Sequence, residues 1–181
     1  LYTFKIKAPL TFPPQGGVYY STSDQIIRPG GGGQKYDAEG LYTTWDNDYL
    51  YVTLITGRKQ NVDRGWAAGD LAFDIGNNGT YDYGLVTSSS TGSHASVAGA
   101  GSPGELWKVD DWNYGIWDAS GNQVPDGAGD REHPVSVKAG DSLGQVEEFE
   151  YSDYFRNYGI GPDDNKHYAV SAAISIESLF G

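Results

Sequence analysis

The chain has 181 residues, 26 of them glycine, with 14% aromatic residues, a formal net charge of -12 and neither Cys nor Met. The acidic balance disfavours nucleic acid as a partner, because phosphate binding requires a basic face. The absence of Cys excludes disulfides, zinc–thiolate sites and a thiol nucleophile. No apolar run approaches the ~20 residues of a membrane-spanning helix, so the composition indicates strands joined by glycine-rich loops.

The first segment, Leu1–Lys7, alternates apolar and polar residues and predicts a strand or an extended arm within residues 1–14. Its apolar residues Tyr2, Phe4 and Ile6 share one face. A segment of this kind can add to an exposed sheet edge of a neighbouring copy, so these three residues are strand-exchange candidates. Because the chain lacks Met and begins on this segment, we expect a processed piece of an exported protein.

The central part of the chain carries the strongest strand signals, in Leu41–Thr56, Asp70–Ile75 and Tyr81–Val86. These segments alternate with period two and are rich in β-branched and aromatic residues, which favours strands packed on at least one face. Gly76–Thr80 lies between the second and third segments and contains an Asn-Gly pair, a strong hairpin signal. We expect this region to form the centre of an all-β, jelly-roll-like sandwich with long Gly/Ser-rich loops.

The hairpin loop is also the best candidate for a Ca²⁺ site, because oxygen-bearing residues follow the spacing of a calcium-binding loop. The candidate ligands are Asp74, Asn78, the carbonyl of Thr80, and Asp82. The match is partial, since Gly76 and Leu85 stand where such a loop has an acid. The alternative is a plain hairpin turn in which Asn and Gly supply the positive φ angles.

A second acidic group consists of Asp37, Glu39, Asp46 and Asp48. Asp46 and Asp48 are two residues apart, so in a regular strand they share a face that can bind a cation. The alternative is a solvated turn, for which Asp and Asn are typical.

Ser88–Gly104 consists almost entirely of small and polar residues and predicts an exposed loop. Glu105–Asp118 then carries Trp107, Trp112 and Trp117, which are candidates for stacking on the apolar faces of sugars. Their spacing of five residues places successive tryptophans on opposite faces of a continuous strand, so at least one belongs in the core.

The last third of the chain predicts strands in Pro134–Lys138, Gln145–Tyr151 and His167–Ile176, followed by one helical turn in Glu177–Gly181. No repeat and no internal boundary is present, so residues 1–181 are expected to form one domain. The three histidines are scattered and no nucleophile elbow or phosphate loop occurs, so we expect no enzyme.

Several motifs together resemble bacterial exported surface proteins of the exosortase-sorted, PEP-CTERM-like kind. They are Tyr36–Tyr42, Asp46–Val52, Ile55–Gly57, Gly69–Gly79 and Trp112–Trp117. The segments Asp46–Val52 and Ala173–Gly181 also resemble family 9 carbohydrate-binding modules. The resemblance implies export to the cell surface and a β-sandwich that can hold structural Ca²⁺. Neither the sorting anchor nor the strand that usually follows the Leu-Phe-Gly turn occurs in these 181 residues, so we expect a sandwich that lacks or exchanges one strand.

Three functions follow from these patterns. The first is a non-catalytic extracellular structural protein that assembles into a homo-oligomer, polymer or fibril by strand exchange or edge pairing, with Ca²⁺ as a stabilising ion. The second is a carbohydrate-binding module that holds a polysaccharide on the tryptophans. The third is a fragment of an enzyme whose catalytic residues lie outside this segment.

Overall fold

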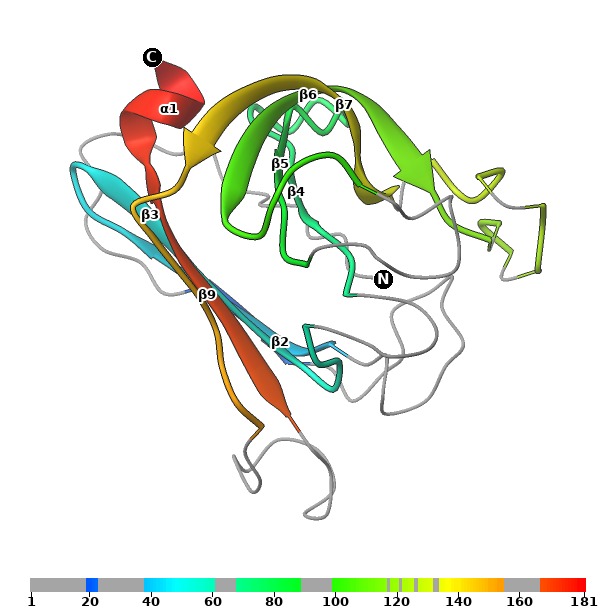
Figure 1. Ribbon diagram of the computed structural model, residues 1–181, viewed down its shortest axis with the longest axis horizontal. Helices are drawn as coiled ribbons and strands as arrows, with labels where there is room; N and C mark the ends of the chain where they lie inside the picture. The colour runs from blue at the N-terminus through cyan, green and yellow to red at the C-terminus, as the bar shows by residue number, and fades with distance from the viewer. Residues whose placement is uncertain are drawn as a thin grey trace.

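The computed structural model describes residues 19–22, 38–60, 68–88, 99–116, 118–120, 122–125, 127–131, 134–154 and 167–181. These residues form two antiparallel sheets, with strand order β1-β2-β3-β9-β8 in sheet A and β4-β5-β6-β7 in sheet B. The elements are β1 (Tyr19–Thr22), β2 (Ala38–Trp45), β3 (Tyr49–Thr56), β4 (Leu71–Phe73), β5 (Tyr83–Leu85), β6 (Glu105–Tyr114), β7 (Pro134–Gln145), β8 (Glu148–Tyr151), β9 (Tyr168–Ser175) and α1 (Ile176–Phe180). The predicted all-β sandwich is confirmed, and Figure 1 shows β6 and β7 arching above the flat sheet of β2, β3 and β9.

Sheet A contributes alternate residues of β3 and β9 to the main core. In the antiparallel register, Leu50 lies opposite Ile174 and Leu54 lies opposite Val170, and all four side chains are buried. These residues stand at alternate positions of both strands, which places them on the face that meets sheet B. Sheet B supplies the other half of this first core through four buried side chains, those of Leu71, Phe73, Leu85 and Leu106.

Sheet B also buries its second face, on which a second core forms. Its buried members are Ala72, Tyr81, Val86, Trp112 and Val137. The approach to β5 is so close that a Cβ atom on Gly84 would lie 2.8 Å from the Trp112 ring, so only glycine fits there. Register shifts between β6 and β7 accompany the strong curvature of this sheet.

Asp70 joins the two outer strands of sheet B at the start of β4. Its backbone N–H donates to the carbonyl of Val135 at 2.9 Å. Its buried carboxylate accepts the N–H of Thr87 at 3.0 Å through Oδ1 and the N–H of Val137 at 2.9 Å through Oδ2. One aspartate thus pairs backbone groups that no neighbouring strand would otherwise satisfy, which holds the curled sheet together.

Several predicted elements have the expected form. The segment Leu41–Thr56 is divided between β2 and β3 by the turn at residues 46–48, and β4 pairs with β5 as the predicted hairpin. The strand predicted in Pro134–Lys138 continues to Gln145 as β7, and α1 is the predicted helical turn. The predicted strand Leu1–Lys7 lies outside the described residues. In the described part of the chain, no helix has both the length and the apolar character that crossing a membrane requires.

Candidate functional site

Trp112 is a core residue. Its side chain is 6% exposed, its indole N–H donates to the carbonyl of Tyr81 at 3.1 Å, and its ring meets the Tyr81 ring edge to face. An aromatic ring in this position cannot stack on a sugar, so the prediction of Trp112 as a binding residue is wrong, although the expectation that at least one of the tryptophans is core is confirmed.

Trp107 also packs against the second core, on the same side of β6 as Trp112. The spacing of five predicted opposite faces, but the register of β6 against β7 shifts between Val109 and Asp111, which reverses the alternation. The indole nitrogen of Trp107 is buried and has no hydrogen-bond partner among the described residues. Trp117 lies outside the described residues, so the tryptophans form no shared platform in the part of the chain that the structure describes.

The predicted calcium loop is held by its own backbone. The buried carboxylate of Asp74 accepts the N–H of Asn78 at 3.0 Å and the N–H of Gly79 at 2.9 Å. The carboxylate of Asp82 accepts the N–H of Ile75 at 2.9 Å, and the side-chain oxygen of Asn78 accepts the N–H of Thr80 at 2.7 Å. Asn77 adopts a φ of 55°, as the hairpin interpretation requires. These hydrogen bonds explain the residue types without a cation, and within the described residues no group of three or more metal-binding side chains is found.

Substitution of Asp74 by Ala is expected to lower the free energy of unfolding by about 1–3 kcal/mol, because two loop amides lose their acceptor. Chemical denaturation with CaCl2 and with EDTA measures this loss and also tests calcium binding. A calcium site in this loop predicts that CaCl2 stabilises the wild type and not the variant. Asp118→Ala is a matched control, because Asp118 accepts the N–H groups of Ser120 and Asn122 in another loop. Equal responses to CaCl2 in all three proteins would contradict a calcium site at Asp74.

In the second acidic group, Asp46 organises the turn between β2 and β3. Its Oδ1 accepts the N–H groups of Asp48 and Tyr49, and its Oδ2 accepts the hydroxyl of Tyr51 at 3.0 Å. These backbone hydrogen bonds hold the pKa of Asp46 below its usual value. Asp48 lies in this turn and Glu39 lies in β2, whereas Asp37 lies outside the described residues.

A groove on the outer face of sheet A was not expected from the sequence. Its volume is about 570 Å³, and it runs across the middle of β3, β9 and β8. Two rows of side chains cross it. Tyr51, Ala173 and Glu148 form one row, and Thr53, Ser171 and Glu150 form the other.

The sequence contained only part of the information needed to predict this groove. The alternation of β3 shows that Tyr51 and Thr53 share a face, but it does not show which strand lies next to β3. More than a hundred residues separate Tyr51 from Ser171 along the chain, and the order β3-β9-β8 brings them together.

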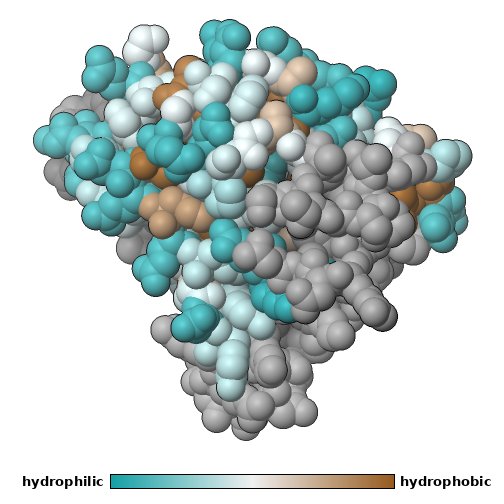
Figure 2. Space-filling view, in the orientation of Figure 1, coloured by the Kyte–Doolittle hydropathy of each residue, from teal (hydrophilic) through white to brown (hydrophobic). Residues whose placement is uncertain are grey.

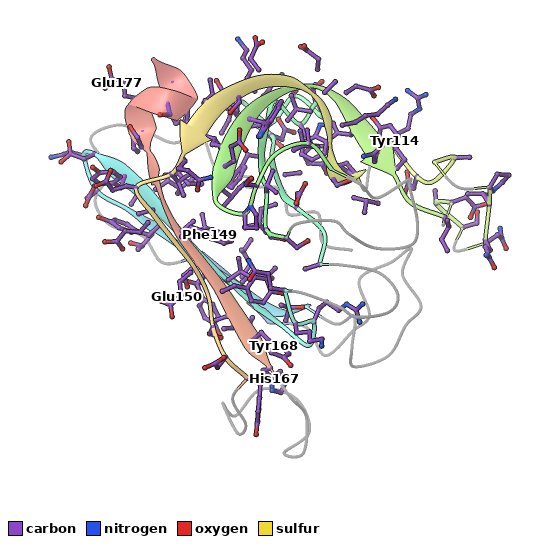
Figure 3. The ribbon with its side chains drawn as sticks, viewed as in Figure 1. Tyr114, Phe149, Glu150, His167, Tyr168 and Glu177 are labelled. Atoms are coloured by element: carbon purple, nitrogen blue, oxygen red, sulfur yellow. The ribbon has the colours of Figure 1, made fainter. Side chains whose placement is uncertain are left out.

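The far wall of the groove is β8, the outermost described strand of sheet A on that side. Glu148 and Glu150 are exposed on the outer face, whereas Phe149 and Tyr151 are half-buried and pack against the first core. Figure 3 shows Phe149 on the side of β8 that faces sheet B and Glu150 on the opposite side. The hydroxyl of Tyr151 donates to the carbonyl of Arg58 at 2.6 Å, and burial raises the pKa of Tyr151 above its usual value.

Comparisons of the chain with protein-family models, with curated proteins and with solved structures find no match. The resemblance to exosortase-sorted surface proteins and to family 9 carbohydrate-binding modules therefore stays a prediction.

Proposed function

We propose that this protein is a non-catalytic extracellular structural protein that assembles with copies of itself by strand addition. In the assembly, the segment Leu1–Lys7 of one copy pairs with the outer edge of β8 in the next, which no described strand occupies. The observation that carries this proposal is the chemistry of β8, whose two faces match the two faces of Leu1–Lys7.

The apolar face of β8 matches the apolar face of Leu1–Lys7. Phe149 and Tyr151 point toward the sandwich and are only half-buried at the end of the first core. A strand added beside β8 would place its inward side chains next to them, about 4.8 Å away in the sheet direction. In Leu1–Lys7 the alternate residues Tyr2, Phe4 and Ile6 supply three large apolar side chains for that position. Burial of each contributes about 1.5–3 kcal/mol when it is complete.

The charged faces match as well. The outward residues of β8 are Glu148 and Glu150, two residues apart, and the alternate face of Leu1–Lys7 carries Lys5 and Lys7, also two residues apart. Opposite charges on directly paired strands are favourable, and like charges are not. Exposed ion pairs contribute little free energy, so these pairs select the register and the partner, and the apolar face supplies the affinity.

The surface drawn in Figure 2 is consistent with assembly through a strand edge. Figure 2 shows a mainly hydrophilic face with scattered apolar residues over the described part of the chain. A β-strand edge offers rows of backbone donors and acceptors, so it can bind another strand without a large exposed apolar patch.

Reversing the charge of the Leu1–Lys7 lysines alone, or of the β8 glutamates alone, is expected to weaken assembly. Reversing both sets together is expected to restore it. The variants are Lys5→Glu with Lys7→Glu, Glu148→Lys with Glu150→Lys, and the combination of both pairs. Light scattering coupled to size-exclusion chromatography measures the particle mass over a range of concentrations and salt. Each single reversal should shift the assembly midpoint to about tenfold higher concentration, which corresponds to about 1.4 kcal/mol.

Two controls make this result specific. Deletion of Leu1–Lys7 removes the donor strand and should leave monomers at every concentration. Asp110→Lys with Asp141→Lys makes the same charge change on exposed residues of sheet B and should leave assembly unchanged. Strand addition at β8 would be refuted by a wild type that stays monomeric. It would also be refuted if the variant with all four substitutions assembled no better than the variants that reverse only the lysines or only the glutamates.

A further inference from the structure

The groove on the outer face of sheet A has three different sides. One wall is the ring of Tyr51 on β3, the floor is Ala173 and Ser171 on β9, and the other wall is Glu148 and Glu150 on β8. Tyr51 and Glu148 are separated by two interstrand spacings, or roughly 10 Å, with only the small Ala173 between them. Small floor residues between long wall residues are what make the groove hollow.

The Tyr51 wall is an exposed aromatic ring that is already fixed in place. The side chain is 36% exposed, and its hydroxyl donates to the carboxylate of Asp46 at 3.0 Å. Asp46 is held in turn by the N–H groups of Asp48 and Tyr49, and the ring of Tyr49 lies 6.1 Å from the Tyr51 ring. A ring held in this way loses little conformational entropy when a flat ligand stacks on it.

The other sides offer hydrogen-bonding groups. The hydroxyl of Thr53 on β3 lies 3.0 Å from that of Ser171 on the floor, so one of the two protons remains for a ligand. Across from Tyr51, the exposed carboxylates of Glu148 and Glu150 are strong acceptors for hydroxyl donors. The groove thus combines one apolar face with several acceptors and at least one donor.

We propose that this groove binds a neutral polysaccharide chain. A sugar ring has an apolar face that suits the Tyr51 ring and a rim of hydroxyls that suits the carboxylates and the floor. The two glutamates and Asp46 repel anionic glycans and nucleic acids. The groove crosses β3, β9 and β8 within one copy, so the proposal does not rest on self-assembly, although a strand added beyond β8 would engage Glu148 and Glu150.

Isothermal titration calorimetry of the full chain with hexasaccharides of β-1,4-linked glucose, mannose and xylose tests the proposal. We expect at least one to bind, and Tyr51→Ala to weaken that binding about tenfold or more, as loss of an aromatic stacking partner does. Tyr51→Phe keeps the ring and should stay within about threefold of the wild type. Ala173→Val fills the floor of the groove and should also weaken binding, whereas Leu143→Ala changes an exposed residue of sheet B and should not.

An anionic oligosaccharide, such as hexameric alginate, tests whether the negative charge of the groove excludes anionic glycans. Binding of the neutral hexamers without binding of alginate supports the proposal. Failure of all three neutral hexamers to bind, or binding that is unchanged in Tyr51→Ala and Ala173→Val, overturns it. None of these variants alters Leu1–Lys7 or the β8 glutamates, so light scattering on the same samples shows separately whether self-assembly persists.

Discussion

Above about pH 7, where Asp70 is ionised in the folded protein, substitution of Asp70 by Asn is expected to lower the free energy of unfolding by about 1–3 kcal/mol. Asp70 is buried, and its two carboxylate oxygens accept the N–H groups of Thr87 and Val137. An Asn side chain has one acceptor oxygen, so its NH2 group would face one of these backbone donors. Asp70→Ala leaves both buried donors without an acceptor, and we expect about twice the loss. Urea denaturation followed by tryptophan fluorescence measures both values.

The penalty for Asp70→Asn should also depend on pH. Burial raises the pKa of Asp70 from 3.8 to about 7, although the hydrogen bonds from Val137 and Thr87 lower it. Between these two values the folded protein holds a proton that the unfolded chain has released, so the unfolding free energy contributed by Asp70 falls as the pH rises. Asn does not titrate. The stability difference between wild type and Asp70→Asn should therefore shrink by about 1.4 kcal/mol for each pH unit between these pKa values, and level off above pH 7.

Comparison of the two proteins at several pH values isolates this effect from the other carboxylates, which titrate in both. Asp111→Asn is a contrasting control, because the hydrogen bond from Lys138 lowers the pKa of this exposed residue. Its difference from the wild type should grow, not shrink, as the pH rises through the acid range. A difference for Asp70→Asn that stays constant or increases with pH would show that its folded-state pKa is not raised.

Substitution of Trp112 by Ala is expected to cost about 3–5 kcal/mol of unfolding free energy. Trp112 fills the second core beside Tyr81 and Val137, so the variant leaves a cavity and also loses the hydrogen bond to the carbonyl of Tyr81. Trp112→Phe keeps an aromatic ring in the cavity and should lose about half as much. Chemical denaturation measures all of these values, with Leu143→Ala as a surface control expected within about 0.5 kcal/mol of the wild type.

The same variants separate the two interpretations of the tryptophan. A core residue predicts that Trp112→Phe binds the neutral hexasaccharides as the wild type does, under conditions in which it is folded. A Trp112→Ala protein with full stability and reduced sugar affinity would return Trp112 to the binding surface and contradict its place in the second core.

The sequence by itself determined the class of fold and most of the strands. Alternation in Tyr49–Thr56 and Tyr168–Ser175 is a local property, since successive side chains of a strand point to opposite faces whatever lies beside it. The hairpin between β4 and β5 was predictable for the same reason, because glycine and asparagine angles determine the turn within a few residues.

The tertiary structure decided the position of each candidate site. A shifted register next to Val109 brought Trp107 and Trp112 to one core, which a regular alternation could not predict. Asp70 resembles any polar residue before a strand, and its burial depends on the curling of β7 toward β4. The groove requires β8, β9 and β3 to lie side by side, and strand order is set by contacts between segments far apart in the chain. Local patterns indicate which face a residue occupies, and only the packed sheets show what that face meets.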